Sequence, residues 1–135
     1  MRTSETVPAP RWRPFCEAFS RVHRGWLVDV WFRNTPGVPA GACDDSDRLI
    51  RGLPLTEIVA EAHARRTDLV ILARGPRGHV DHHVRGVVQL TVTRDLRGTE
   101  NGLVALAADG GSTRLRFRVA APPEAVDGDT PDATV

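Results

Sequence analysis

Residues 79–83 contain the densest group of side chains that could bind a metal ion or transfer a proton. Side chains alternate between the two faces of an extended strand, so His79, Asp81 and His83 share one face and His82 lies on the other. Two imidazoles and a carboxylate are ligands that zinc and iron accept. Alternate strand residues stand about 7 Å apart, however, which spreads three ligands too widely for one tetrahedral ion. A fourth ligand would have to come from elsewhere in the chain: His23, Cys43 or His63.

Two interpretations of residues 79–83 therefore stay open. In the first, His82 is a half-buried histidine hydrogen-bonded to the backbone, its polar neighbours are solvated, and the protein needs no cofactor. The alternative is a metal- or histidine-dependent enzyme centred on these residues, with His79, Asp81 and His83 as the ligands of a zinc cofactor. The chain has no phosphate-binding glycine loop, nucleophile elbow or zinc-protease motif that would indicate another active site.

Three arginines, Arg114, Arg116 and Arg118, form a stripe at every other position of a predicted strand. Their step of about 7 Å resembles the separation of phosphates along a nucleic-acid strand, and a guanidinium can bind phosphate in a bidentate manner. The stripe lacks the interleaved aromatic residues that single-strand binders use for stacking. We expect the charged outer face of a hairpin; weak nucleic-acid or anion binding is an alternative, and nucleic acid is not the expected partner.

Trp31 is a further candidate contact residue. The alternation of residues 26–33 turns it away from Val30 and Phe32, which belong to the opposite face of the strand. Trp31 either packs under a helix, so that both faces of the strand are covered, or is an exposed anchor for a partner.

One helix and several strands must position these residues. Apolar residues recur at helical spacing over residues 12–24, and Gly25 suits a left-handed C-terminal cap. Within this helix we expect Cys16 to be a small core residue and His23 to interact with the helix dipole. Residues 56–66 are compatible with either strand or helix. The apolar stripe consists of Trp12, Phe15, Cys16, Phe19 and Val22, and strands are predicted over residues 26–33, 48–51, 53–59, 69–74, 79–84 and 87–94.

A C-terminal hairpin is predicted with a definite register. The sequence DGGS that begins at residue 109 offers a two-residue glycine loop, because glycine tolerates the positive φ that such turns require. This loop pairs Leu106 with Leu115 and Val104 with Phe117 on one face, and places arginines over small residues on the other.

Together these elements predict an α+β fold in which an N-terminal amphipathic helix packs on a curved antiparallel sheet, or small barrel, of six to seven strands. We expect residues 10–119 to form a single domain and residues 1–9 to be disordered. Residues 120–135 carry four acidic residues and no arginine, and are expected to be a disordered acidic tail. By charge, this tail could fold over the arginine stripe.

The composition is that of an ordinary globular protein. The chain has 135 residues, of which 41% are hydrophobic and 26% charged, with a net charge of +1. No apolar run approaches the roughly 20 residues of a membrane span, and no secretory signal is visible. Neither of the two cysteines lies in a C-x-x-C pair. We therefore expect a cytoplasmic protein with no membrane partner.

A series of motifs runs in order through residues 12–118: Trp12, FCEAFSRVHRGWLV at 15–28, LPL at 53–55, HVDH at 79–82 and ADGGSTRLRFR at 108–118. This order resembles a family of small bacterial, largely actinobacterial, proteins catalogued only as a domain of unknown function. The chain departs from that family at residues 60–67, where the family tends to carry a Gly/Asp-rich turn. The resemblance implies a shared fold and a bacterial origin, and no mechanism.

The sequence alone does not identify a function. The interpretation that we favour is a non-catalytic binding or protein-interaction module of a bacterial cytoplasm, with a protein or anionic partner. Its candidate contact residues are Trp31, Arg114, Arg116 and Arg118.

Overall fold

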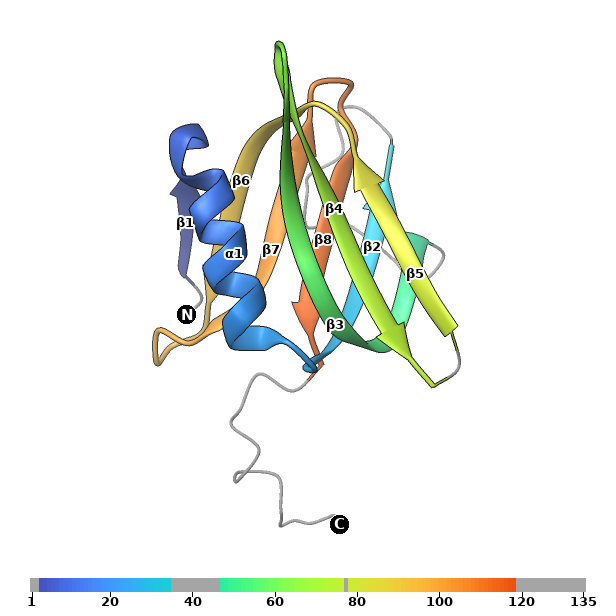
Figure 1. Ribbon diagram of the computed structural model, residues 1–135. Helices are drawn as coiled ribbons and strands as arrows, with labels where there is room; N and C mark the ends of the chain where they lie inside the picture. The colour runs from blue at the N-terminus through green and yellow to red at the C-terminus, as the bar shows by residue number, and fades with distance from the viewer. Residues whose placement is uncertain (1–2, 35–46, 77, 119–135) are drawn as a thin grey trace.

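The computed structural model describes residues 3–34, 47–76 and 78–118 (Figure 1). In these residues one α-helix and one short 3-10 helix accompany eight β-strands, so the predicted α+β class is confirmed with more strands than the six to seven expected. The helices are η1 (Ala9–Arg11) and α1 (Trp12–His23). The strands are β1 (Thr3–Val7), β2 (Leu27–Arg33), β3 (Arg48–His63), β4 (Arg66–Gly75), β5 (Gly78–Val84), β6 (Val87–Arg94), β7 (Glu100–Ala107) and β8 (Ser112–Phe117).

All eight strands form one antiparallel sheet, in the order β1-β6-β7-β8-β2-β3-β4-β5. The sheet curves around the core, as Figure 1 shows, but it does not close. β5 leads directly into β6, yet the two strands do not pair, because β1 occupies the edge of β6 that β5 would need. The barrel alternative is therefore wrong.

The N-terminal strand β1 corrects the expectation that residues 1–9 are disordered. Thr3–Val7 pairs with β6, from Thr3 opposite Arg94 to Val7 opposite Leu90. Only Val7 of this strand is buried, so no hydrophobic alternation marks it in the sequence. Its order comes from backbone hydrogen bonds to β6. The acidic tail, residues 120–135, lies outside the described residues.

Helix α1 agrees with the predicted helix. It buries Trp12, Cys16 and Phe19 from the expected stripe, together with Ser20 and His23. Val22 was expected in the stripe but is 61% exposed, because the buried face follows steps of three and four residues from Trp12 and passes beside it. Within the described segments no helix has the length and apolar character needed to cross a membrane.

The long strand β3 explains where α1 packs. Its first part pairs with β2, and the part from Leu55 onward pairs with β4 on its other edge. β2 pairs only with the first part of β3, so among the described residues the same edge of β3 is without a strand partner from Leu55 onward. Helix α1 and the residues after it cover this edge. The N–H of Ile58 donates to Ser20 Oγ (2.8 Å), and the N–H of Leu55 donates to the Trp26 carbonyl (2.8 Å). Residues 56–63 are therefore strand, and the two strands predicted over 48–59 are one.

The C-terminal hairpin forms, but its predicted register is wrong by three residues. Leu115 lies opposite Leu103, and Leu106 lies opposite Ser112. The cause is the loop: Asp109 Oδ1 accepts the N–H of Gly111 (2.9 Å), which lengthens the turn beyond two residues. An odd shift exchanges the faces of β7, so Leu103, rather than Leu106, enters the core.

Candidate functional site: an arginine face on the outside of the sheet

Trp31 lies on the outer face of β2. Its two neighbours in the sequence belong to the opposite face, where Val30 is in the core and Phe32 is half-buried. Trp31 stands opposite Arg48 of β3 and opposite Arg114 of β8. The guanidinium carbons of Arg48 and Arg114 lie 5.1 Å and 5.9 Å from the centre of a Trp31 ring. Both distances fit cation–π contacts. Trp31 is therefore held between two arginines, and the alternative that it packs under the helix is wrong, because α1 packs on the core side of the sheet.

Asp29 forms a second row across the same three strands. It stands opposite Arg51 of β3 and opposite Arg116 of β8. Its carboxylate accepts the N–H of Gly52 (2.8 Å) and the Nε–H of Arg118 (3.2 and 3.3 Å to its two oxygens). A second guanidinium, that of Arg48, lies 3.7 Å from the same carboxylate. Asp29 is thus the common anchor of this group of side chains.

Gly52 is required for this arrangement. Its φ of +64° is one that L side chains rarely adopt, and a Cβ at this position would stand 2.9 Å from Nε of Arg118. The glycine therefore leaves room for the Arg118 guanidinium to lie against β3 while it binds Asp29 of β2.

We call this surface the arginine face and define it as Asp29, Trp31, Arg48, Arg51, Arg114, Arg116 and Arg118. Counting these residues alone, five guanidinium groups surround one carboxylate. At its margin Arg33 pairs with Asp47 (2.7 Å) and adds no net charge. The arginine face is thus a positively charged patch built around a half-buried indole.

The predicted contact residues are brought together by the structure. Arg114 and Arg116 lie on the outer face of β8, beside Trp31 and Asp29 of β2. Arg118 follows the end of β8 and binds the same Asp29. Sequence reasoning missed the two arginines from β3 and the anchoring role of Asp29. The alternation of residues 26–33 places Asp29 and Trp31 on one face, but nothing local in the chain shows that β3 and β8 are the neighbours of β2.

Residues 79–83 alternate between the two faces of β5, as predicted. His79, Asp81 and His83 are exposed along one face of β5. Among the described residues, no group of three His, Cys, Asp or Glu side chains is arranged to hold an ion. The spread of alternate strand residues accounts for this.

His82 points into the interior and is half-buried, as expected. Its Nε2 shares a 2.9 Å hydrogen bond with the Thr113 hydroxyl of β8, where a backbone partner had been predicted. The Phe32 ring lies 5.3 Å from the imidazole. Burial lowers the pKa of His82, and the neighbouring His83 lowers this pKa further. A neutral His82 thus bridges two strands that are not neighbours in the sheet.

His23 is buried at the C-terminal end of helix α1. Its Nδ1–H donates to the Phe19 carbonyl (2.8 Å), and its ring packs on Phe117, with centroids 4.5 Å apart. Burial lowers the pKa of His23 more than the Phe19 carbonyl and Glu100 raise it. The interaction of His23 with the helix dipole therefore stays a prediction: the ring binds a carbonyl of the last helical turn, and burial disfavours its charged form.

Cys16 has the predicted core role. It is a buried free thiol, and burial, with Glu17 adding to it, raises its pKa to about 12. A thiol with this pKa stays protonated near neutral pH and is a poor nucleophile. The other cysteine, Cys43, lies outside the described residues.

No protein-family model matches the chain, and neither the curated proteins nor the solved structures contain a match. The resemblance to a bacterial family therefore stays a prediction.

Proposed function

We propose that this protein is a small non-catalytic binding module of the bacterial cytoplasm that holds an acidic protein segment on its arginine face. The observation that carries the proposal is the pair of rows across β3, β2 and β8, which places Trp31 between two arginines and Asp29 between two more. Arg118 adds a fifth guanidinium, which binds the Asp29 carboxylate. The buried thiol of Cys16 fits a reducing compartment.

The side chains of the arginine face suit a protein partner. Tryptophan and arginine are the residue types most enriched where protein interfaces are energetically strong. Trp31 is half-buried, so it needs little further ordering on binding, and the contacts from Arg48 and Arg114 hold its ring in place. Arg51, Arg116 and Arg118 are exposed, and a guanidinium group binds a carboxylate in a bidentate manner.

A protein partner is favoured over single-stranded nucleic acid by the state of Trp31. Base stacking needs a free aromatic face. The guanidinium groups of Arg48 and Arg114 approach the Trp31 rings from the strands on either side. The one aromatic side chain of the arginine face is thus already engaged.

The proposal can be tested with a fluorescently labelled decaglutamate peptide. We expect saturable binding by fluorescence anisotropy at low salt, and weaker binding as the salt concentration rises. Arg51→Gln/Arg116→Gln removes the two exposed arginines that face Asp29 and should weaken binding about 5- to 30-fold, because each exposed charge contributes up to about 1 kcal/mol.

The matched control is Arg65→Gln/Arg97→Gln, which removes two exposed arginines from turns outside the arginine face. This variant has the same net charge and should bind decaglutamate like the parent protein. An equal loss of affinity in both double variants would mean that only net charge matters. Tighter binding of a ten-nucleotide oligo-dT than of decaglutamate would assign the arginine face to nucleic acid and overturn the proposal.

A further inference from the structure

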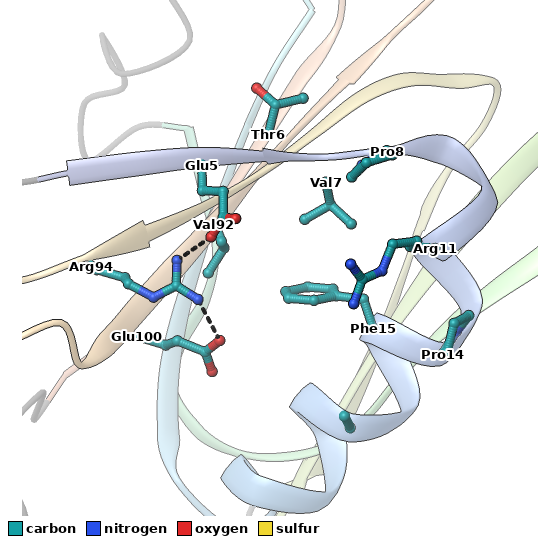
Figure 2. Close-up of a pocket in the computed structure, with 11 residues that line it drawn as sticks. Glu5, Thr6, Val7, Pro8, Arg11, Pro14, Phe15, Val92, Arg94 and Glu100 are labelled. Carbon is teal, nitrogen blue, oxygen red and sulfur yellow. Dashed lines mark hydrogen bonds and ion pairs between the residues drawn. The ribbon is translucent and has the colours of Figure 1, made fainter.

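A cavity of about 320 Å³ lies between β1, α1 and the strands β6 and β7 (Figure 2). It follows from the course of the chain. β1 pairs with β6, the chain turns back through η1, and α1 then leans on β3 rather than on β1. The space between the edge strand and the helix is therefore not filled by either element.

The cavity has an apolar middle and a charged end. Val7, Phe15 and Val92 line the middle. At the charged end Arg94 binds two carboxylates, Glu5 at 2.6 Å and Glu100 at 3.4 Å, as Figure 2 shows. The charge of Arg94 is thus satisfied by the protein itself.

Two buried groups hold the walls in place. The indole N–H of Trp12 donates to the Val7 carbonyl (2.7 Å), which joins the start of the helix to the end of β1. On the opposite wall, Glu100 lies 3.7 Å from Nε2 of the buried His23. The cavity therefore exists before any ligand arrives, which lowers the entropic cost of binding.

Arg11 is the other cation of the lining. It is exposed, and its side chain forms no hydrogen bond or ion pair with any other described residue. In Figure 2 the Arg11 side chain extends from the helical side toward the middle of the cavity, apart from the Arg94 group. An unpaired guanidinium beside an apolar floor is the arrangement that binds an anion with a hydrocarbon body.

We propose that this cavity binds a small aliphatic monocarboxylate, with the carboxylate on Arg11 and the hydrocarbon chain on Val7, Phe15 and Val92. Its volume of about 320 Å³ corresponds to about ten water-sized groups at roughly 30 Å³ each. A chain of eight carbons with its carboxylate has this size. This site is separate from the arginine face and does not depend on the function proposed for that face.

The probe for this site is octanoate, compared with octanol and octylamine by isothermal titration calorimetry below the concentrations at which they self-associate. We expect octanoate to bind to one site and at least about tenfold more tightly than octanol, because only the carboxylate gains a charge-assisted bond to Arg11. Octylamine should bind more weakly than octanoate, since its ammonium cannot bind the Arg11 guanidinium.

Two variants and one control test the charge of Arg11 and the volume of the cavity separately. Arg11→Gln should reduce octanoate affinity to that of octanol, whereas Arg21→Gln, which removes an exposed arginine of helix α1 outside the cavity, should leave it unchanged. Ala18→Leu fills the cavity from the helix side and should abolish binding of all three probes. Circular dichroism confirms that each variant is folded. Equal affinity for octanoate and octanol, an unchanged Arg11→Gln, or no saturable octanoate binding would overturn the proposal.

Discussion

Ser20→Ala should destabilise the protein by about 2 kcal/mol, because one buried hydroxyl joins helix α1 to strand β3. Ser20 is 2% exposed. Its Oγ accepts the N–H of Ile58 (2.8 Å) and lies within hydrogen-bond distance of the Cys16 carbonyl (2.7 Å) and the Ile58 carbonyl (3.2 Å). Alanine leaves the Ile58 N–H buried without a partner, at a cost of about 1–3 kcal/mol. The lost volume is one oxygen atom, so the cavity adds little.

Urea denaturation at pH 7.5 measures this loss, and amide hydrogen exchange locates it. The denaturation midpoint should fall without a change in m-value, and the Ile58 amide should lose protection more than its neighbours in β3. Ser4→Ala, at an exposed position of β1, is the control and should change stability by less than about 0.5 kcal/mol. A loss below about 0.5 kcal/mol in Ser20→Ala, with the Ile58 amide still protected, would refute the role of this hydroxyl in joining helix and sheet.

Three further outcomes are expected. Burial lowers the pKa values of His23 and His82 below the usual 6.5, so the unfolded chain binds protons more readily than the folded protein. The free energy of unfolding should therefore be highest above pH 6.5 and fall as the pH drops below it. Urea midpoints at pH 7.5 and 5.0 measure this fall, and His82→Asn should make it smaller. Gly102→Ala should lower the free energy of unfolding by about 1–3 kcal/mol or prevent folding, because the alanine Cβ would stand 2.4 Å from the Leu115 carbonyl oxygen. A thermal unfolding midpoint equal to that of the parent protein would contradict the close approach of β7 and β8. Removal of residues 120–135 takes away four acidic residues and should tighten decaglutamate binding at low salt, since these carboxylates no longer compete for the arginine face; coincident anisotropy curves for the two chains would rule out such competition.

The two proposed sites use different chemistry on opposite sides of the sheet. The arginine face gathers its charge on the outer side of β2 and β8, whereas the cavity opens beside α1 and β1 and has one unpaired cation in its lining among the described residues. Variants at one site should therefore leave binding at the other unchanged, because additivity holds for distant residues that share no partner.

Periodicity along the chain was enough to predict individual elements. The helical spacing from Trp12 to His23 and the alternation of Leu27–Arg33 are local properties, so α1 and β2 occur where the sequence indicates them. The outward direction of the β8 arginines follows from the same alternation. For this reason the candidate contact residues could be named without knowing the neighbours of each strand.

Strand neighbours and registers were decided only by the tertiary structure. Whether Trp31 meets Arg114 depends on β2 and β8 being adjacent, which is a matter of backbone hydrogen bonds between segments far apart in the chain. β1 has almost no buried side chain and pairs with β6 alone, so a search for apolar patterns could not detect it. Likewise, the hydrogen bond that Asp109 Oδ1 accepts from the Gly111 N–H sets the length of the last turn, and with it the register of β7 against β8. Local patterns specify which way a side chain points, because backbone geometry repeats; what it meets there depends on pairings that no local pattern encodes.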